Sequence, residues 1–183
     1  ILKVKLQSLN NYAKFKNDIN DLKNDFYRVD WKEIAKHQSK KFLLIKKIDC
    51  LDLRLQSLTK LLIPIISKYL GTLPIIQDAA FWYSPNTFND KMRSQNWHID
   101  GEDYKQVKIW LPIENVEENC GPLHAININE TNKIFDSLNK NKFYKKRNKK
   151  ISDEQMEKLL DQEKINILTM NKDEICFVDT CNC

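Results

Sequence analysis

The chain has 183 residues, of which 42% are hydrophobic and 30% charged, a composition typical of one folded domain with a real core. No apolar run approaches the roughly 18 residues of a membrane-spanning helix, and the first residues lack the apolar segment of a signal peptide, so we expect no membrane partner. Five cysteines without regular spacing do not predict a disulfide framework, so we expect a cytoplasmic protein. The chain does not begin with Met, and we expect that its true N-terminus is missing.

The formal net charge of +5 is spread over Lys-rich stretches, and the run at residues 140–150 is strongly basic. One interpretation is a contact for phosphate or nucleic acid. The simpler one is a solvated loop, because the run has few Arg residues and little aromatic interleaving, so a nucleic-acid partner is not expected. Cys181 and Cys183 resemble half of a thiolate metal site, but no second pair has zinc-site spacing, which favours ordinary cysteines.

Residues 1–48 are polar, with scattered apolar positions that indicate helical or irregular packing. Residues 50–70 repeat apolar side chains at about 3.6-residue spacing, which predicts an amphipathic helix on the outside of a sheet. Pro64 lies within this pattern and predicts a kink or a boundary. Gly71 supplies the helix stop.

From Leu73 onward short apolar runs alternate with turn residues, which is typical of a jelly roll. Two helices are expected among them, and the second opens with Ser152 and Gln155 in the spacing of a capping box. The expected strands cover residues 73–83, 96–100, 106–113, 123–128, 165–170 and 174–179, and the expected helices cover 130–138 and 152–162.

His98, Ile99 and Asp100 form the most informative motif. Side chains two apart in a strand point to the same face, so this His and this carboxylate can bind one cation. With a second His they would form the two-His-one-carboxylate set of non-haem Fe(II) oxygenases. The H-x-D pattern also arises by chance in surface turns, so its neighbours matter.

Those neighbours are Trp97, directly before His98, and residues 107–123, which read VKIWLPIENVEENCGPL. Together with the H-x-D motif they resemble the phytanoyl-CoA dioxygenase-like family of Fe(II)- and 2-oxoglutarate-dependent oxygenases. The resemblance covers residues 83–123, returns at 173–183 with the run DEICFVDT, and is poor or absent over the first seventy residues.

The resemblance implies a mainly β fold with flanking helices (α+β), built as a double-stranded β-helix of the jelly-roll, cupin-like kind. Residues 1–72 would form an N-terminal helical cover of the same domain. Residues 73–183 would form the oxygenase core, with a helical insert at about 130–162. The family's distal His and its 2-oxoglutarate-binding Arg are expected beyond Cys183, so we expect a fragment whose final strands are missing and which has little or no activity alone.

In this interpretation His98 and Asp100 are ligands of Fe(II), and Trp110 and Tyr83 contact the cosubstrate 2-oxoglutarate. Packing in the core is the alternative for both aromatic residues. Lys108 shares the face of Trp110 and could meet an anionic group, although a solvent-facing lysine is the simpler interpretation. His124 is a rival third ligand, but it comes too early in the strand order.

The implied reaction uses O2 to hydroxylate a small organic substrate, with release of succinate and CO2. An Asp at position 100 favours hydroxylation over halogenation, which would need a small residue there. Two alternatives stay open. One is a cupin-like metalloprotein that does not use 2-oxoglutarate, and the other is a non-catalytic binding module. The sequence does not identify the substrate or the oligomeric state.

Overall fold

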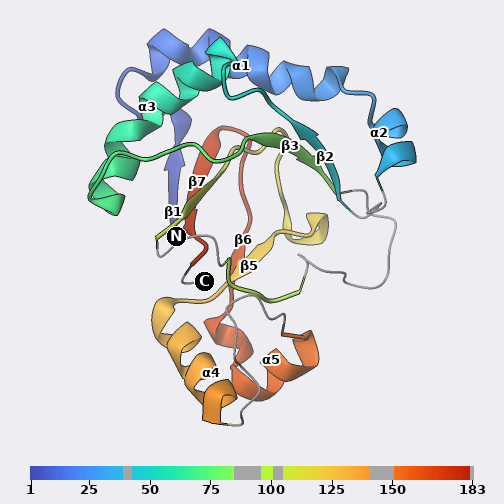
Figure 1. Cartoon of the computed structure of the whole chain (residues 1–183), viewed down its shortest axis with the longest axis vertical. Coiled ribbons are helices and arrows are strands. Elements are labelled where there is room, and N and C mark those ends of the chain that lie inside the picture. The colour runs from blue at the N-terminus through green and yellow to red at the C-terminus, as the bar shows by residue number, and fades with distance from the viewer. Residues whose placement is uncertain (39–42, 85–95, 101–104, 141–150, 182–183) are drawn as a thin grey trace. The chain divides into compact units, whose positions relative to one another are not determined.

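The structure is a computed structural model, and it describes residues 1–38, 43–84, 96–100, 105–140 and 151–181 (Figure 1). It is 45% helical and 22% strand, and the strands form small antiparallel sheets. The expected mixture of helix and sheet is therefore confirmed. Helix outweighs strand, however, so the described chain is more helical than a mainly β fold.

The chain divides into two compact units, which are described separately here. One unit comprises Val4–Asn89, and the other comprises Ile1–Lys3 with Asp90–Cys183. Residues 73–84 group with the preceding helices, whereas the sequence suggested that they belong with the later strands. The assignment of residues 1–72 and 73–183 to one domain stays a prediction.

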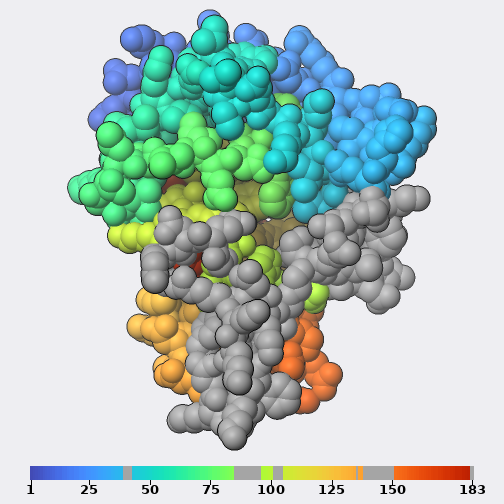
Figure 2. Space-filling view, viewed as in Figure 1, coloured from blue at the N-terminus to red at the C-terminus, as the bar shows by residue number. Residues whose placement is uncertain are grey.

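The Val4–Asn89 unit is built on two long helices, α1 (Tyr12–Arg28) and α3 (Leu53–Leu70), which pack against each other. Figure 2 shows their blue and cyan-green atoms as part of one continuous surface. The unit also contains a 3-10 turn (Leu6–Ser8), α2 (Trp31–His37), β2 (Leu44–Lys47) and β3 (Ala80–Tyr83). Its buried side chains lie at helical spacing and include Ile19, Leu22, Leu55, Leu58, Leu62 and Ile66.

Helix α3 confirms the helix expected over residues 50–70. Asp52 caps its start by accepting a hydrogen bond from the Arg54 backbone N at 2.8 Å. Gly71 ends it in the left-handed conformation (φ 78°), and its N–H donates to Ser67 O at 2.8 Å. Pro64 lies inside the helix without ending it.

Strand β3 is much shorter than the strand expected over residues 73–83. It pairs antiparallel with β2, from Leu44 opposite Tyr83 to Lys47 opposite Ala80. Residues 73–79 form no strand, and Ile75 is 92% exposed. Pro74 offers no backbone N–H to a neighbouring strand, and pairing with β2 begins only at Ala80.

The second unit contains the strands around the motif. β4 (Val107–Trp110) pairs antiparallel with β7 (Glu174–Asp179), and the sheet order is β1 (Leu2–Lys5), β7, β4. β5 (Leu123–Ala125) pairs antiparallel with β6 (Asn166–Leu168). One apolar core joins the two pairs and consists of Ala125, Leu168, Met170, Cys176 and Val178, with Trp110, Val116 and Leu123 packed against it.

Two helices complete this unit, α4 (Ile128–Lys140) and α5 (Asp153–Leu159), with 3-10 turns at Glu118–Cys120 and Gln162–Lys164. Ser152 accepts from the Gln155 backbone and Gln155 accepts from the Ser152 backbone, so the predicted capping box is confirmed. A second apolar core holds the helices, formed by Ile126, Ile134, Ile151, Met156 and Leu160, with Trp97, Leu159 and Ile165 packed against it.

None of the helices within the described residues combines the length and the hydrophobicity needed to cross a bilayer.

Candidate metal centre

The segment that carries the H-x-D motif is held at both ends by backbone hydrogen bonds to different partners. Trp97 O accepts from Ile151 N at 2.8 Å, and Asp100 N donates to Thr180 O at 3.1 Å. Only Trp97 forms a β-bridge, so the prediction of a continuous strand over residues 96–100 is wrong. Because the two bonds go to different segments, no ladder forms, yet the motif stays beside the end of β7.

The side chains of His98 and Asp100 converge. His98 Nε2 lies 3.7 Å from Asp100 Oδ1, and the two side chains are 30% and 14% exposed. The same-side arrangement expected from their spacing is therefore present, although the backbone between them is not a regular strand. An imidazole nitrogen and a carboxylate oxygen are both donors that suit Fe(II).

The His98 ring is oriented by its other nitrogen. Nδ1 lies 2.7 Å from the carbonyl oxygen of Asn96, and a carbonyl only accepts, so Nδ1 carries the proton and donates it. In the neutral ring Nε2 then holds the lone pair, on the side of Asp100. Metal-binding histidines are commonly fixed in this way, by an N–H donated to a backbone carbonyl.

Lys108 is the third charged group at the centre. It lies in β4 opposite the buried Val178 of β7, and its Nζ is 2.7 Å from Asp100 Oδ2. Its side chain is 31% exposed, so it faces solvent in part while its ammonium pairs with Asp100. The anionic group that it meets is Asp100, one of the predicted metal ligands, and no pattern in the sequence indicated this partner.

Two opposing effects act on the Asp100 carboxyl. Burial raises its pKa, while the Lys108 ammonium, the Thr180 hydroxyl and the nearby His98 lower it. The lowering effects are larger together, so the pKa of Asp100 is below its ordinary value. Asp100 is therefore ionised near neutral pH, which is the form that binds a cation.

The two predicted cosubstrate contacts lie in different units. Trp110 ends β4, two residues after Lys108, and packs against the apolar core beside Cys176 and Val178. Tyr83 ends β3 in the Val4–Asn89 unit, where its ring lies 5.4 Å from that of Trp31. A contact with 2-oxoglutarate stays a prediction for both.

No third metal-binding side chain joins His98 and Asp100 within the described ranges, where no group of three or more His, Cys, Asp or Glu side chains is arranged to hold a metal. His124 lies in β5 with its ring 6.2 Å from that of Trp97. His37 is exposed on α2 beside Glu33. The basic run at 140–150 lies outside the described residues except for Lys140, and Cys183 lies outside them too.

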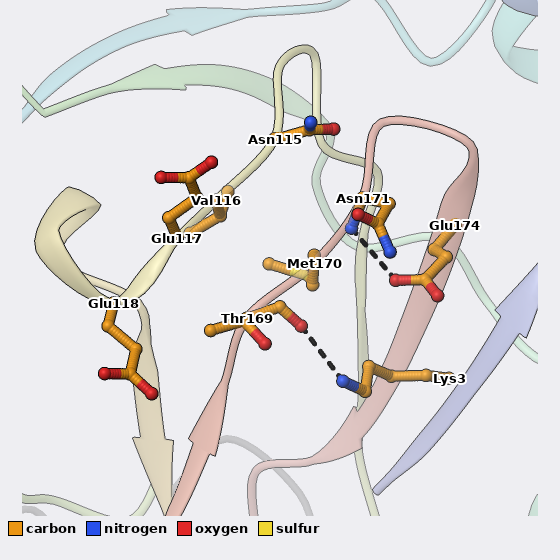
Figure 3. Close-up of a pocket in the computed structure, with 9 residues that line it drawn as sticks. All are labelled: Lys3, Asn115, Val116, Glu117, Glu118, Thr169, Met170, Asn171 and Glu174. Atoms are coloured by element: carbon orange, nitrogen blue, oxygen red, sulfur yellow. Dashed lines mark hydrogen bonds between the residues drawn. The ribbon is translucent and has the colours of Figure 1, made fainter.

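A polar hollow of about 350 Å³ lies at another place in the same unit (Figure 3). Its wall includes Glu117, Glu118 and Glu174, and the Lys3 ammonium donates to Thr169 O at 3.0 Å. Neither His98 nor Asp100 lines it, so this hollow and the H-x-D motif are separate features.

Comparisons of this chain with protein-family models, with curated proteins and with solved structures found no match. The family resemblance therefore depends on the sequence pattern alone, and the site is argued from its own geometry.

Proposed function

We propose that this chain is the metal-binding part of an Fe(II)- and 2-oxoglutarate-dependent dioxygenase of the phytanoyl-CoA dioxygenase-like kind. The observation that carries the proposal is the convergence of His98 Nε2 and Asp100 Oδ1 to 3.7 Å, with His98 Nδ1 held on the other side of the ring by the Asn96 carbonyl at 2.7 Å. The sequence around the motif, Trp97 and residues 107–123, adds support through its resemblance to that family.

The two donors fit one divalent ion. Bonds of about 2.1 Å to nitrogen and oxygen at a right angle place two ligand atoms about 3 Å apart. The observed 3.7 Å lies within a small side-chain rotation of that value. The proposal requires a second histidine ligand, because the known iron sites of this class use two histidines and one carboxylate. Neither His37 nor His124 is grouped with His98 and Asp100 in the part of the chain that the structure describes.

In this proposal the residues of the chain have different roles. His98 and Asp100 hold the ion, and the apolar core next to Trp110 keeps water from that side of the sheet. Iron with 2-oxoglutarate supplies the activation of O2 for hydroxylation of a small organic substrate, with succinate and CO2 as coproducts. We place this reaction in the cytoplasm.

The proposal also concerns the fold. The antiparallel pairs β4–β7 and β5–β6 share one apolar core, as strands of a jelly roll do. We propose that these pairs are parts of a double-stranded β-helix, with α4 and α5 as an insert.

An anaerobic Fe(II) titration tests the proposed function. We expect one ion per chain for the unchanged protein and loss of that binding in His98→Ala. His37→Ala removes an exposed histidine of the other unit and serves as the matched control. Succinate formation that requires both iron and 2-oxoglutarate, measured on the dioxygenase of which this chain would be the metal-binding part, would separate the dioxygenase from a cupin-like metalloprotein. Iron binding that is unchanged in His98→Ala would remove the proposal.

One observation favours a second candidate, a non-catalytic binding module. The Lys108 ammonium already neutralises Asp100 at 2.7 Å, so the carboxylate is satisfied without a metal. A binding module would be as stable with a metal chelator as without it, and the chelator would not release its bound ligand. Its His98→Ala variant would bind that ligand as tightly as the unchanged chain.

A further inference from the structure

The two oxygens of the Asp100 carboxylate face different partners. Oδ1 lies 3.7 Å from His98 Nε2, and Oδ2 lies 2.7 Å from Lys108 Nζ. A carboxylate that binds a metal through one oxygen leaves the other for an outer hydrogen bond, and such bonds hold the ligand in place. The arrangement leaves Oδ1 on the side of the imidazole.

The parts that hold Asp100 are themselves fixed by β7. The backbone N–H of Asp100 donates to Thr180 O, directly after the end of β7. Lys108 lies opposite Val178 in the β4–β7 register, and Val178 is 1% exposed in the apolar core. The carboxylate is therefore held through its backbone and through Oδ2, both from the same strand pair.

We propose that Lys108 is the positioning residue of the metal centre, holding Asp100 Oδ2 so that Oδ1 and His98 Nε2 bind one ion. This inference rests on the proposed function. The ammonium stays in place when the metal binds, and it adds one positive charge beside the ion. The loaded centre therefore favours an anionic ligand, such as a carboxylate, at the open positions of the metal.

The contrary arrangement is a lysine that competes with the metal for Asp100. The two arrangements predict opposite changes in metal affinity when Lys108 is removed. A positioning lysine strengthens metal binding, and its removal weakens binding about 10- to 100-fold, as for other outer hydrogen bonds to metal ligands. A competing lysine weakens metal binding, and its removal strengthens it.

The test is an anaerobic calorimetric titration with Co²⁺ or Mn²⁺, with the melting temperature of each variant measured in parallel. We expect Lys108→Met to weaken binding at least tenfold and Lys108→Arg, which keeps the charge and the donor, to recover most of the loss. Lys158→Met removes an ammonium that pairs with Glu154 on the surface of α5, and this control should bind as the unchanged protein does.

If Lys108→Met binds the metal as tightly as the unchanged chain, or more tightly, the inference about Lys108 is overturned. The proposed function still stands in that case, provided that binding by the unchanged chain depends on His98. If the unchanged chain showed no His98-dependent binding, both would fail. A second measurement needs no variant: chemical labelling of lysines with and without Co²⁺. Lys108 should stay protected at metal saturation, and labelling that rises on metal addition would overturn the inference.

Discussion

Asp100 and Lys108 form an ion pair of 2.7 Å between a loop and β4, and both side chains are mostly buried. The pair joins the H-x-D segment to the β4–β7 sheet, so it contributes to the stability of the unit as well as to the candidate site. Because both partners are partly shielded from water, they attract each other more strongly than an exposed pair does, and loss of either partner leaves the other charge poorly solvated.

A double-mutant cycle measures this contribution. We expect Asp100→Asn and Lys108→Met to be coupled by about 1–2 kcal/mol in the free energy of unfolding. The same cycle on Glu154 and Lys158, whose side chains are 78% and 71% exposed, should give below about 0.5 kcal/mol. Urea unfolding supplies all the values, and equal coupling in the two cycles would contradict the assignment.

Arg54 joins the two long helices and carries a pH-dependent contribution. It contacts Asp25 of α1 and Asp52 at the start of α3, and its hydrogen bonds lower the pKa of Asp52 from 3.8 to about 2. A pKa lowered in the folded state adds stability above the unfolded value, and this stability is lost as the pH falls from about 4 to about 2.

We therefore expect Arg54→Met to lower the free energy of unfolding by about 1–2 kcal/mol at pH 7, with a smaller loss at pH 2.5. Lys36→Met, which breaks an exposed pair with Glu33, should leave the free energy of unfolding nearly unchanged. Denaturant titrations at several pH values check this, and a loss from Arg54→Met that grows toward low pH would refute it.

Gly71 ends α3 with φ 78°, and a Cβ placed there would contact nothing within 4 Å. Backbone conformation is therefore the whole cost of a substitution. We expect Gly71→Ala to destabilise the chain by about 1 kcal/mol and Gly71→Asn by less, because Asn adopts this conformation more readily. Thermal unfolding compares the two variants, and an alanine variant as stable as the unchanged protein would contradict the account.

Ser152 caps α5 through the backbone N–H of Gln155 at 3.3 Å. Ser152→Ala leaves that N–H without its side-chain acceptor, and we expect a loss of about 1 kcal/mol. Ser152→Asp keeps an acceptor and should lie within a few tenths of the unchanged protein. Urea unfolding of the pair checks the cap, and equal losses in both would rule it out.

Local patterns predicted many of the elements. The apolar spacing before Gly71 predicted α3, and the capping box at Ser152 predicted α5, because both signals lie within one helix. The runs at 106–113 and 174–179 contain β4 and β7. The strand at 73–83 was overestimated, because apolar composition does not show where a pairing partner begins.

The site was predicted only in part. The spacing of His98 and Asp100 predicted two side chains on one side, and they converge. Lys108 was missed as the partner of Asp100, because their contact depends on where the loop meets β4. The acceptor for His98 Nδ1, the carbonyl of Asn96, was equally invisible, since backbone carbonyls leave no mark in a sequence.

The central claim is that His98 Nε2 binds a metal ion together with Asp100. Nitrogen-15 NMR of the imidazole rings during a Zn²⁺ titration tests it directly, because the chain has only three histidines to assign. We predict a metal-free His98 protonated at Nδ1 and a large shift of its Nε2 signal on Zn²⁺ addition, with His37 unchanged and the shift abolished in Asp100→Asn. A His98 Nε2 signal that stays unaffected at saturating Zn²⁺ would contradict the account.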